Sequence, residues 1–344
     1  MKILILKPSS LGDVIQALPV LRLLKLHYPA GKIYWWIDSA LAPLLEGDPD
    51  LAGIVRFERK RWGKLQHWPE MFRSIRWLRA QKFDLVIDLQ GLARSGIFAW
   101  LTRGKFLAGL DEVREGARAF YDLAAPRQSF HTHAVDWYLA VLPLLGVPVH
   151  KNFIWLPERP ALAAEVKRKW ADELVSTPHW IALQPGARWE NKRWPAEYFA
   201  DLVRQTAAQF PDTRFAILGN AGDQPLGEII SRAAPERCLN LCGATSLPEM
   251  IEWVRLCELM VTNDTGPMHA AAALGKPVIA LFGPTEPRRT GPYGQLGNVL
   301  RIDLPCSPCL SADCTFYAKP NECLKALSPA LVFARVQKLL SPRA

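Results

Sequence analysis

The amino-acid sequence predicts an α/β protein made of two parallel sheets that follow one another along the chain. Short aliphatic runs recur throughout, and most precede a polar turn and a segment with helical spacing of its apolar residues. This alternation is typical of a parallel sheet. Three prolines within residues 146–160 predict a linker between two such series. The length of 344 residues also exceeds what a single core usually supports.

Strands of the first series are predicted where aliphatic and aromatic residues form short runs, because buried parallel strands are apolar on both faces. They cover residues 2–6, 33–37, 53–57, 85–88 and 106–109. Helices are predicted at residues 11–27, near 39–46, up to about 81 after a long basic loop, after the turn 90–96, and at 134–145. The polar stretch before residue 134 is predicted to be irregular.

The second series repeats the pattern after a helix predicted near residues 162–174. Its strands are predicted at residues 180–184, 214–218, 237–241, 259–261 and 278–282, and its helices at 196–210, 226–234, 247–257 and 268–274. Residues 329–340 are amphipathic, and we expect them to form a helix that packs back across the junction. The predicted domains are residues 1–155 and 156–327, with residues 328–344 as a C-terminal helix.

The most distinctive polar turn is Asp264-Thr265-Gly266-Pro267-Met268-His269, which lies between two strands and opens an Ala-rich helix. Pro267 suits a first helical position, where a missing N–H costs nothing, and Asp264 or Thr265 can cap the free amides. At the carboxyl end of a parallel strand, such a helix start favours an anion. An ordinary capped helix has the same residues, so this stretch alone leaves both interpretations open.

Composition indicates an ordinary soluble globular chain, with 49% hydrophobic residues. The first residues, Met-Lys-Ile-Leu-Ile-Leu-Lys, form too short an apolar run for a signal peptide. Nothing approaches the roughly 20 apolar residues of a membrane span. We therefore expect a cytoplasmic protein.

A basic segment, residues 56–82, contributes much of the formal charge of +9. Its nine Lys and Arg face only two glutamates, and aromatic residues are interleaved with them. Such a segment can meet nucleic acid, an anionic membrane surface or a phosphorylated substrate. A solvated helix face with core aromatics is the alternative. No zinc-finger, KH or RNP pattern supports a nucleic-acid partner.

Four of the seven cysteines are close together in sequence, at Cys306, Cys309, Cys314 and Cys323. A Cys-x-x-Cys followed by two further cysteines can hold zinc or an iron–sulfur cluster. These spacings match no standard ferredoxin or zinc ribbon, however. We expect reduced thiols or a facultative disulfide here, and no bound metal or other cofactor.

Two Rossmann-like halves usually enclose a cleft between the carboxyl ends of their sheets, and the polar turns are predicted to converge there. Gly186, Lys192 and Arg193 follow one strand and supply what a diphosphate needs, namely close backbone approach, donors and positive charge. The turn 219–223 follows the next strand along the chain. A surface loop with two solvated cations remains the alternative for residues 185–193.

Asp13 is the one carboxylate in the first polar turn of the first half. It can cap its helix, and facing a diphosphate pocket it would suit a general base. Dehydrogenase chemistry is not supported, because Gly12 stands alone where G-x-G-x-x-G would be. Walker A is absent. Asp48-Pro49-Asp50 has proline at its centre and is typical of a turn, which disfavours a metal-held nucleotide sugar.

Together these motifs resemble the lipopolysaccharide heptosyltransferases of glycosyltransferase family 9, nearly end to end and in the same order. The similar stretches are Lys7-Pro8-Ser9-Ser10-Leu11-Gly12-Asp13, Asp88-Leu89-Gln90-Gly91, Pro185-Gly186-Ala187 with Lys192-Arg193-Trp194-Pro195, and residues 263–269 with Phe282-Gly283-Pro284-Thr285. The tail beginning Cys306-Ser307-Pro308-Cys309 resembles the heptosyltransferase II branch more than the I branch.

The resemblance implies a GT-B fold and an inverting, metal-independent transfer from ADP-L-glycero-D-manno-heptose to the lipopolysaccharide inner core. It makes Asp13 the catalytic base and Lys192 the lysine that binds the diphosphate. The donor-binding residues it implies are Gly186, Arg188, Asn220, Asp223, Asp264, Thr265, Gly266 and His269. The acceptor-binding residues, which would meet Kdo carboxylates and lipid A phosphates, are Ser10, Gly12, Arg59, Lys60, Arg61, Lys64, Gln90, Arg94, Arg114 and His133.

This sequence departs from the I branch at Arg188 and Trp189 near the donor and at Trp137 on the acceptor side. The identities of the acceptor and of the transferred sugar therefore stay open. A family 9 transferase using another nucleotide sugar, or a non-catalytic nucleotide-binding protein of the same fold, are the alternatives. We expect a monomer without a nucleic-acid partner. It would lie in the cytoplasm, on the inner membrane of a Gram-negative bacterium, through residues 56–82.

Overall fold

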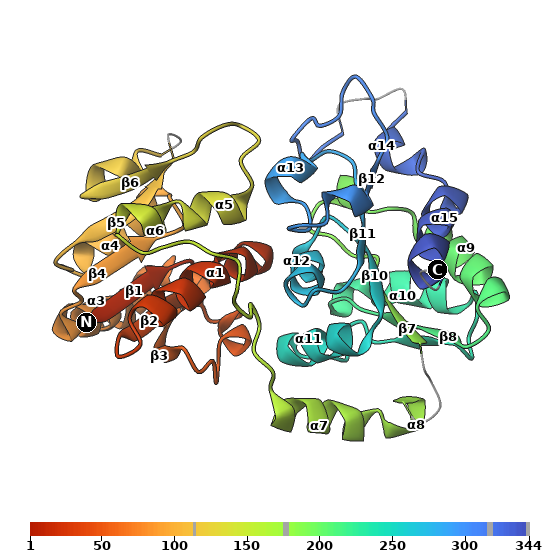
Figure 1. The fold of residues 1–344 in the computed structure, drawn as a ribbon, viewed down its shortest axis with the longest axis horizontal. Coiled ribbons are helices and arrows are strands. Elements are labelled where there is room, and N and C mark those ends of the chain that lie inside the picture. The colour runs from red at the N-terminus through yellow and green to blue at the C-terminus, as the bar shows by residue number, and fades with distance from the viewer. Residues whose placement is uncertain (113–114, 175–178, 315–318, 342–344) are drawn as a thin grey trace. The chain divides into compact units, whose positions relative to one another are not determined.

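The computed structural model describes residues 1–112, 115–174, 179–314 and 319–341. The chain divides into two compact units, Met1–Pro157 (unit 1) and Glu158–Ala344 (unit 2). Each unit contains one six-stranded sheet flanked by helices, and Figure 1 shows both. All the strand pairs in both sheets are parallel. The predicted α/β class is therefore confirmed.

The sheet of unit 1 has the strand order β3-β2-β1-β4-β5-β6. Its strands are Lys2–Leu6 (β1), Lys32–Asp38 (β2), Leu51–Phe57 (β3), Leu85–Asp88 (β4), Leu107–Asp111 (β5) and Leu123–Pro126 (β6). Its α-helices are Leu11–His27 (α1), Arg59–Trp62 (α2), Trp68–Gln81 (α3), Ala93–Leu101 (α4), Ala134–Leu139 (α5) and Val141–Leu144 (α6). Short 3-10 turns occur at Ala42–Leu44 (η1), Leu65–His67 (η2) and Ala117–Phe120 (η3).

Two predictions for unit 1 were wrong. The helix expected near residues 39–46 is only the single turn η1, because Gly47 adopts a positive φ of 77° and Pro49 follows it, so the chain leaves the helical conformation at once. The stretch expected to be irregular contains the edge strand β6. Its sequence, Leu-Ala-Ala-Pro, has low strand propensity, and proline is tolerated only at such an edge.

Arg22 joins α1 to the segment that leaves unit 1. Its buried guanidinium donates to Asp48 and Asp50, with Nη1–Oδ distances of 2.7 Å in both cases. It also donates to the carbonyl of Trp155, at 3.0 Å from Nη2. Asp48-Pro49-Asp50 is therefore a structural turn that pairs with a cation of the chain itself.

The sheet of unit 2 has the order β12-β11-β10-β7-β8-β9. Its strands are His179–Gln184 (β7), Thr213–Ile217 (β8), Cys238–Asn240 (β9), Leu259–Asn263 (β10), Val278–Phe282 (β11) and Val299–Arg301 (β12). Its α-helices are Pro160–Lys169 (α7), Ala171–Leu174 (α8), Ala196–Gln209 (α9), Gln224–Ser231 (α10), Leu247–Leu256 (α11), Gly266–Ala273 (α12), Pro287–Thr290 (α13), Glu322–Lys325 (α14) and Pro329–Leu340 (α15). Its 3-10 turns are Glu190–Lys192 (η4), Ala221–Asp223 (η5) and Leu296–Asn298 (η6).

Every strand predicted for unit 2 is present, but several other elements differ from the prediction, among them the short helices α13 and α14, which were not predicted. The edge strand β12 has only three residues and gave no sequence signal. Helix α12 begins at Gly266, two residues before the predicted start, so Pro267 occupies the second helical position. Helix α15 packs on α9 and β11, as Figure 1 shows, and its Val332 and Val336 are buried in the core of unit 2. Its expected packing across the junction stays a prediction.

Both sheets have the same strand order when each is counted from its own first strand. In unit 1 the chain runs outward from β1 to β3, then returns to β4 beside β1. Unit 2 does the same with β7 and β10. At such a switch point the loops after the two central strands diverge, and this is where ligands bind in open α/β sheets. The loops after β1 and β4, and those after β7 and β10, are therefore the candidate ligand-binding loops of the two sheets. No helix among the described residues is long and apolar enough to span a bilayer.

Candidate active site

A cation and a carboxylate meet at the switch point of unit 2. Lys192, at the end of η4, donates from Nζ to Oδ2 of Asp264 after β10, at 2.5 Å. The hydroxyl of Thr285 donates to the same oxygen at 2.6 Å. The ring of Trp189 lies 4.6 Å from the ammonium. Both charged side chains are largely buried, with 16% of Lys192 and 7% of Asp264 exposed, so each holds the other in place.

The buried side chain of Asn263 fastens the two loops together. Its Nδ2 donates to the carbonyl of Pro185 at 2.7 Å, and its Oδ1 accepts from the backbone N–H of Trp194 at 3.0 Å. One amide thus fixes both ends of the loop that contains Lys192. Asn263 belongs to residues 263–269, which resemble the family, but the sequence gave no indication that its side chain holds these two loops together.

Gly186, Asn220 and Asp223 are brought together at the neighbouring strand end. A Cβ on Gly186 would lie 2.4 Å from the Cγ of Asp223, so only glycine fits beside that buried carboxylate. Oδ2 of Asp223 accepts from the backbone N–H and the Nδ2 of Asn220, at 3.0 and 2.6 Å. Oδ1 of Asn220 accepts from the N–H of Gly222 at 2.7 Å. These polar groups build the turn at η5, and they pack against the buried Gly186.

The start of α12 lies beside Asp264, where Gly266 supplies the first helical N–H, Pro267 has none, and the N–H of Met268 donates to the carbonyl of Thr265 at 3.2 Å. Thr265 is its N-cap in an extended conformation, with Gly266 as the first helical residue. Thr265 and Gly266 are half-buried, whereas His269, in the first turn, is only 8% exposed. Arg188 is exposed on the loop after β7. The helix start, Lys192 and Arg188 together favour an anionic group at this edge.

Asp13 lies at the switch point of unit 1, as the third residue of α1. Its Oδ2 accepts from the backbone N–H and the hydroxyl of Ser10, at 3.0 and 2.6 Å. Its Oδ1 accepts from the hydroxyl of Tyr138 at 3.1 Å. Asp13 therefore does cap its helix, beside the buried Gly12. Capping leaves the carboxylate half-buried, so it does not exclude the role of a base.

Two buried ionisable side chains, Lys7 and Asp88, belong to the same cluster of charges as Asp13. Lys7, only 3% exposed, donates from Nζ to the carbonyl of Leu89 at 3.0 Å. Burial lowers the pKa of Lys7, and the charges of Asp13 and Asp88 oppose that change. Burial likewise raises the pKa of Asp88, opposed by hydrogen bonds from Ser95, Tyr121 and the backbone. Oδ1 of Asp88 accepts from the N–H of Gln90 at 2.8 Å, which shapes the loop after β4.

The expected acceptor residues fall into separate groups. Gln90 is half-buried after β4, and Arg94 is exposed in the first turn of α4. His133 caps α5, where its Nδ1 accepts from the N–H of Val135 at 3.2 Å. The exposed Arg59, Lys60, Arg61 and Lys64 follow β3, an edge strand two positions from β1. Arg114 lies outside the described residues.

The cysteine-bearing segment packs on the loop that contains Thr285. The hydroxyl of Ser307 donates to the carbonyl of Gly283 at 2.6 Å, and the N–H of Leu310 donates to that of Pro284 at 2.7 Å. All seven cysteines are free thiols, and burial raises the pKa of Cys323 to about 11. Among the described residues, no group of three or more His, Cys, Asp or Glu is arranged to hold a metal ion.

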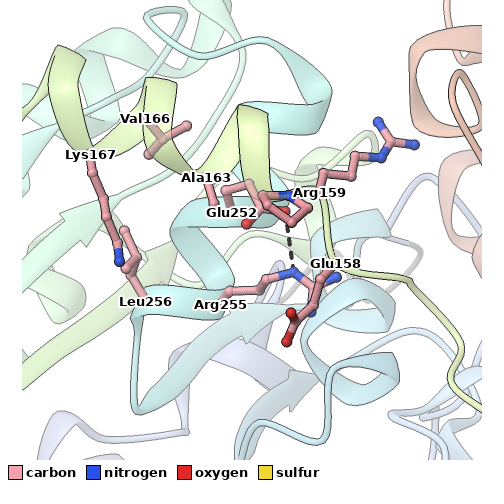
Figure 2. Close-up of a pocket in the computed structure, with 9 residues that line it drawn as sticks. Glu158, Arg159, Ala163, Val166, Lys167, Glu252, Arg255 and Leu256 are labelled. Carbon is pink, nitrogen blue, oxygen red and sulfur yellow. Dashed lines mark hydrogen bonds and ion pairs between the residues drawn. The ribbon is translucent and has the colours of Figure 1, made fainter.

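A cavity of about 260 Å³ lies between α7 and α11 of unit 2. Figure 2 shows its lining, where Nε of Arg255 donates to the buried carboxylate of Glu252 at 3.2 Å. None of the residues predicted for donor or acceptor binding is among those that line it. This cavity is therefore separate from the residues at the two switch points.

Two Rossmann-like units, each with polar side chains at the switch point of its sheet, are the architecture of the GT-B class of proteins. The chain belongs to glycosyltransferase family 9, because the model described as "Glycosyltransferase family 9 (heptosyltransferase)" matches residues 71–319. It is 30% identical to lipopolysaccharide heptosyltransferase 1 of Pseudomonas aeruginosa, over 99% of this chain and 98% of that protein.

Solved structures share the fold over the whole length. E. coli ADP-heptose lps heptosyltransferase II superposes with a TM-score of 0.78 at 24% identity, covering 99% of this chain and 98% of that one. The E. coli heptosyltransferase WaaC, solved with ADP-2-deoxy-2-fluoro heptose, gives 0.74 at 23% identity, over 98% and 99%. The expected GT-B fold and family are both confirmed.

Proposed function

We propose that this protein transfers L-glycero-D-manno-heptose from ADP-heptose to the Kdo/heptose inner core of lipopolysaccharide. The observation that carries the proposal is the Lys192–Asp264 pair beside the N-terminus of α12. It stands in a chain that is similar along nearly its whole length to a lipopolysaccharide heptosyltransferase. A diphosphate that lay between the Lys192 ammonium and the start of α12 would have its negative charge neutralised and would accept hydrogen bonds.

In the proposed donor site, Lys192 and the amides of α12 neutralise the diphosphate as ADP leaves. Asp264 cannot face the diphosphate, since two anions would repel, so its carboxylate holds Lys192 and faces sugar hydroxyls. Gly186, Arg188, Asn220, Asp223, Thr265, Gly266 and His269 complete the proposed donor site. The proposed reaction has no step that uses a bound metal ion.

In the proposed acceptor site, Asp13 removes the proton of the attacking hydroxyl. The acceptor oxygen forms a bond to the anomeric carbon while the bond from that carbon to the diphosphate breaks. ADP departs with the electron pair, and the configuration at the anomeric carbon inverts. Ser10 holds one oxygen of Asp13, and the residues Gly12, Gln90, Arg94, Arg114, His133 and the basic 59–64 segment are proposed to meet the acceptor.

A donor-by-acceptor assay tests this function. We expect release of ADP with ADP-heptose and a Kdo-containing lipid A acceptor, unaffected by EDTA, and little turnover with UDP- or GDP-sugars. A preference for another nucleotide sugar would instead support the alternative family 9 activity. Tight ADP binding with no transfer to any acceptor would support a non-catalytic nucleotide-binding protein.

We further propose that residues 56–82 dock on the cytoplasmic face of an anionic inner membrane. Arg59, Lys60, Arg61, Lys64, Arg73 and Arg76 are exposed. Trp68 and Phe72, on α3, are 43% and 57% exposed, and Leu65 just before it is 72% exposed. The core-aromatic alternative therefore applies to Trp62, which is 8% exposed, and not to these side chains. Cations beside exposed aromatics suit the headgroup region of a bilayer.

Charge reversal on α3 is expected to weaken membrane docking. For Arg73→Glu combined with Arg76→Glu, we expect affinity for phosphatidylglycerol-containing vesicles to fall at least about thirtyfold, since each surface cation contributes about 1 kcal/mol. Lys167→Glu with Arg168→Glu on α7 makes the same change in net charge and should bind as the unchanged protein does. Equal losses in both double variants, measured by vesicle co-sedimentation, would reject α3 as the docking element.

A further inference from the structure

Tyr138, in α5, contacts Asp13 of α1, although the two residues lie far apart in the sequence. Its hydroxyl donates to Oδ1 of Asp13 at 3.1 Å across 125 residues of chain. Helix α5 packs along α1, as Figure 1 shows, and the phenol bonds to Oδ1 of Asp13 while Ser10 bonds to Oδ2. Each oxygen of Asp13 thus accepts from a different element.

The surroundings fix the phenol in place. Tyr138 is 4% exposed, and the ammonium of Lys7 lies 4.7 Å from its ring centroid. Burial raises the pKa of Tyr138 well above its usual value, with the charge of Asp13 adding to the effect and Arg127 opposing it. The hydroxyl therefore keeps its proton at neutral pH, and it donates that proton to the hydrogen bond with Asp13.

We propose that Tyr138 is a positioning residue for the transfer reaction, which holds Oδ1 of Asp13 so that the carboxylate stays ionised and correctly oriented for the acceptor hydroxyl. This inference rests on the proposed function, in which Asp13 is the base. Nothing in the family motifs quoted above includes Tyr138. The charged groups that face this pair are Lys7 after β1 and Arg127 after β6, and Asp88 at the end of β4 acts on Lys7.

A hydrogen bond donated to a carboxylate favours its ionised form. Removing the Tyr138 hydroxyl should therefore make Asp13 easier to protonate. The rate would then begin to fall at a higher pH as the solution is acidified. A substitution that only destabilised unit 1 would lower the amount of active protein. It would leave unchanged the pH at which the rate begins to fall.

The test compares Tyr138→Phe with Tyr121→Phe. Tyr121 is a second buried tyrosine of unit 1, whose hydroxyl donates to Oδ2 of Asp88 at 2.6 Å. For Tyr138→Phe we expect kcat to fall at least about tenfold, as hydrogen bonds to charged groups are worth that much. The acid limb of the kcat profile should move to higher pH, with the KM for ADP-heptose unchanged. Tyr121→Phe should lower the melting temperature and leave the acid limb in place.

Three outcomes are separable when Asp13→Ala is measured alongside. An unchanged rate and pH profile in Tyr138→Phe, with Asp13→Ala inactive, would overturn the positioning role alone. Equal losses of rate and melting temperature in both tyrosine variants, without a shifted limb, would also overturn it. Full activity in Asp13→Ala would instead refute the proposed base, whatever Tyr138→Phe does.

Discussion

Asp13→Ala is expected to abolish transfer while ADP still binds with its normal affinity. A general base contributes about a hundredfold to ten-thousandfold to the rate, so kcat should fall at least about a hundredfold. ADP binding should persist because the residues proposed to hold the diphosphate all belong to unit 2. Initial rates of ADP release and calorimetric titration with ADP measure the two effects separately.

Asp38→Ala is the matched control for this change. Asp38 ends the neighbouring strand β2, and its Oδ1 also accepts a backbone N–H, from Ala40 at 3.0 Å. Both substitutions remove a carboxylate that caps a local turn, which costs about 1 kcal/mol of stability. We expect Asp38→Ala to transfer normally. Normal transfer by Asp13→Ala would show that another group takes the proton.

Lys192→Ala is expected to impair both donor binding and the chemical step. The variant loses the ammonium that would neutralise the departing diphosphate, and it leaves the buried Asp264 without its cationic partner. Loss of one such donor costs about a hundredfold to a thousandfold in kcat. ADP affinity should weaken at least about tenfold, because charge-assisted hydrogen bonds to phosphate are lost.

Lys169→Ala provides the control, because Lys169 makes the same two kinds of contact in the same unit. Its Nζ lies 2.8 Å from Oε1 of Glu249 and 4.2 Å from the ring centroid of Trp170. The Lys169→Ala variant shows how much ADP affinity falls when any lysine that contacts both a carboxylate and an indole ring is removed. If Lys169→Ala and Lys192→Ala lower ADP affinity equally, Lys192 has no direct role at the diphosphate.

Much of the fold could be predicted from the sequence because its central strands are buried on both faces. Runs such as residues 278–282 are apolar throughout, and their pattern leaves few alternatives. The edge strands β6 and β12 could not be found in this way. They are three or four residues long, and they exist because a neighbouring strand offers a free edge, which is a property of the assembled sheet.

The candidate site could be predicted where a residue lies in the loop, or at the helix start, that follows a central strand. Asp13, Lys192 and Asp264 all follow central strands, so strand positions alone bring attention to them. The partners that hold them were not predictable. Thr285 and Tyr138 reach their carboxylates across 21 and 125 residues, and only the packing of the helices and loops determines which side chain arrives there.

The repeated strand order has a consequence for how such a protein changes through evolution. Each switch point is built on its own core, with Trp36 and Phe83 buried in unit 1 and Trp194 and Phe199 in unit 2. Substitutions near Asp13 and substitutions near Lys192 therefore disturb different cores. Given the roles proposed for Asp13 and Lys192, selection could alter the recipient and the activated sugar in separate steps, without one change using the stability that the other requires.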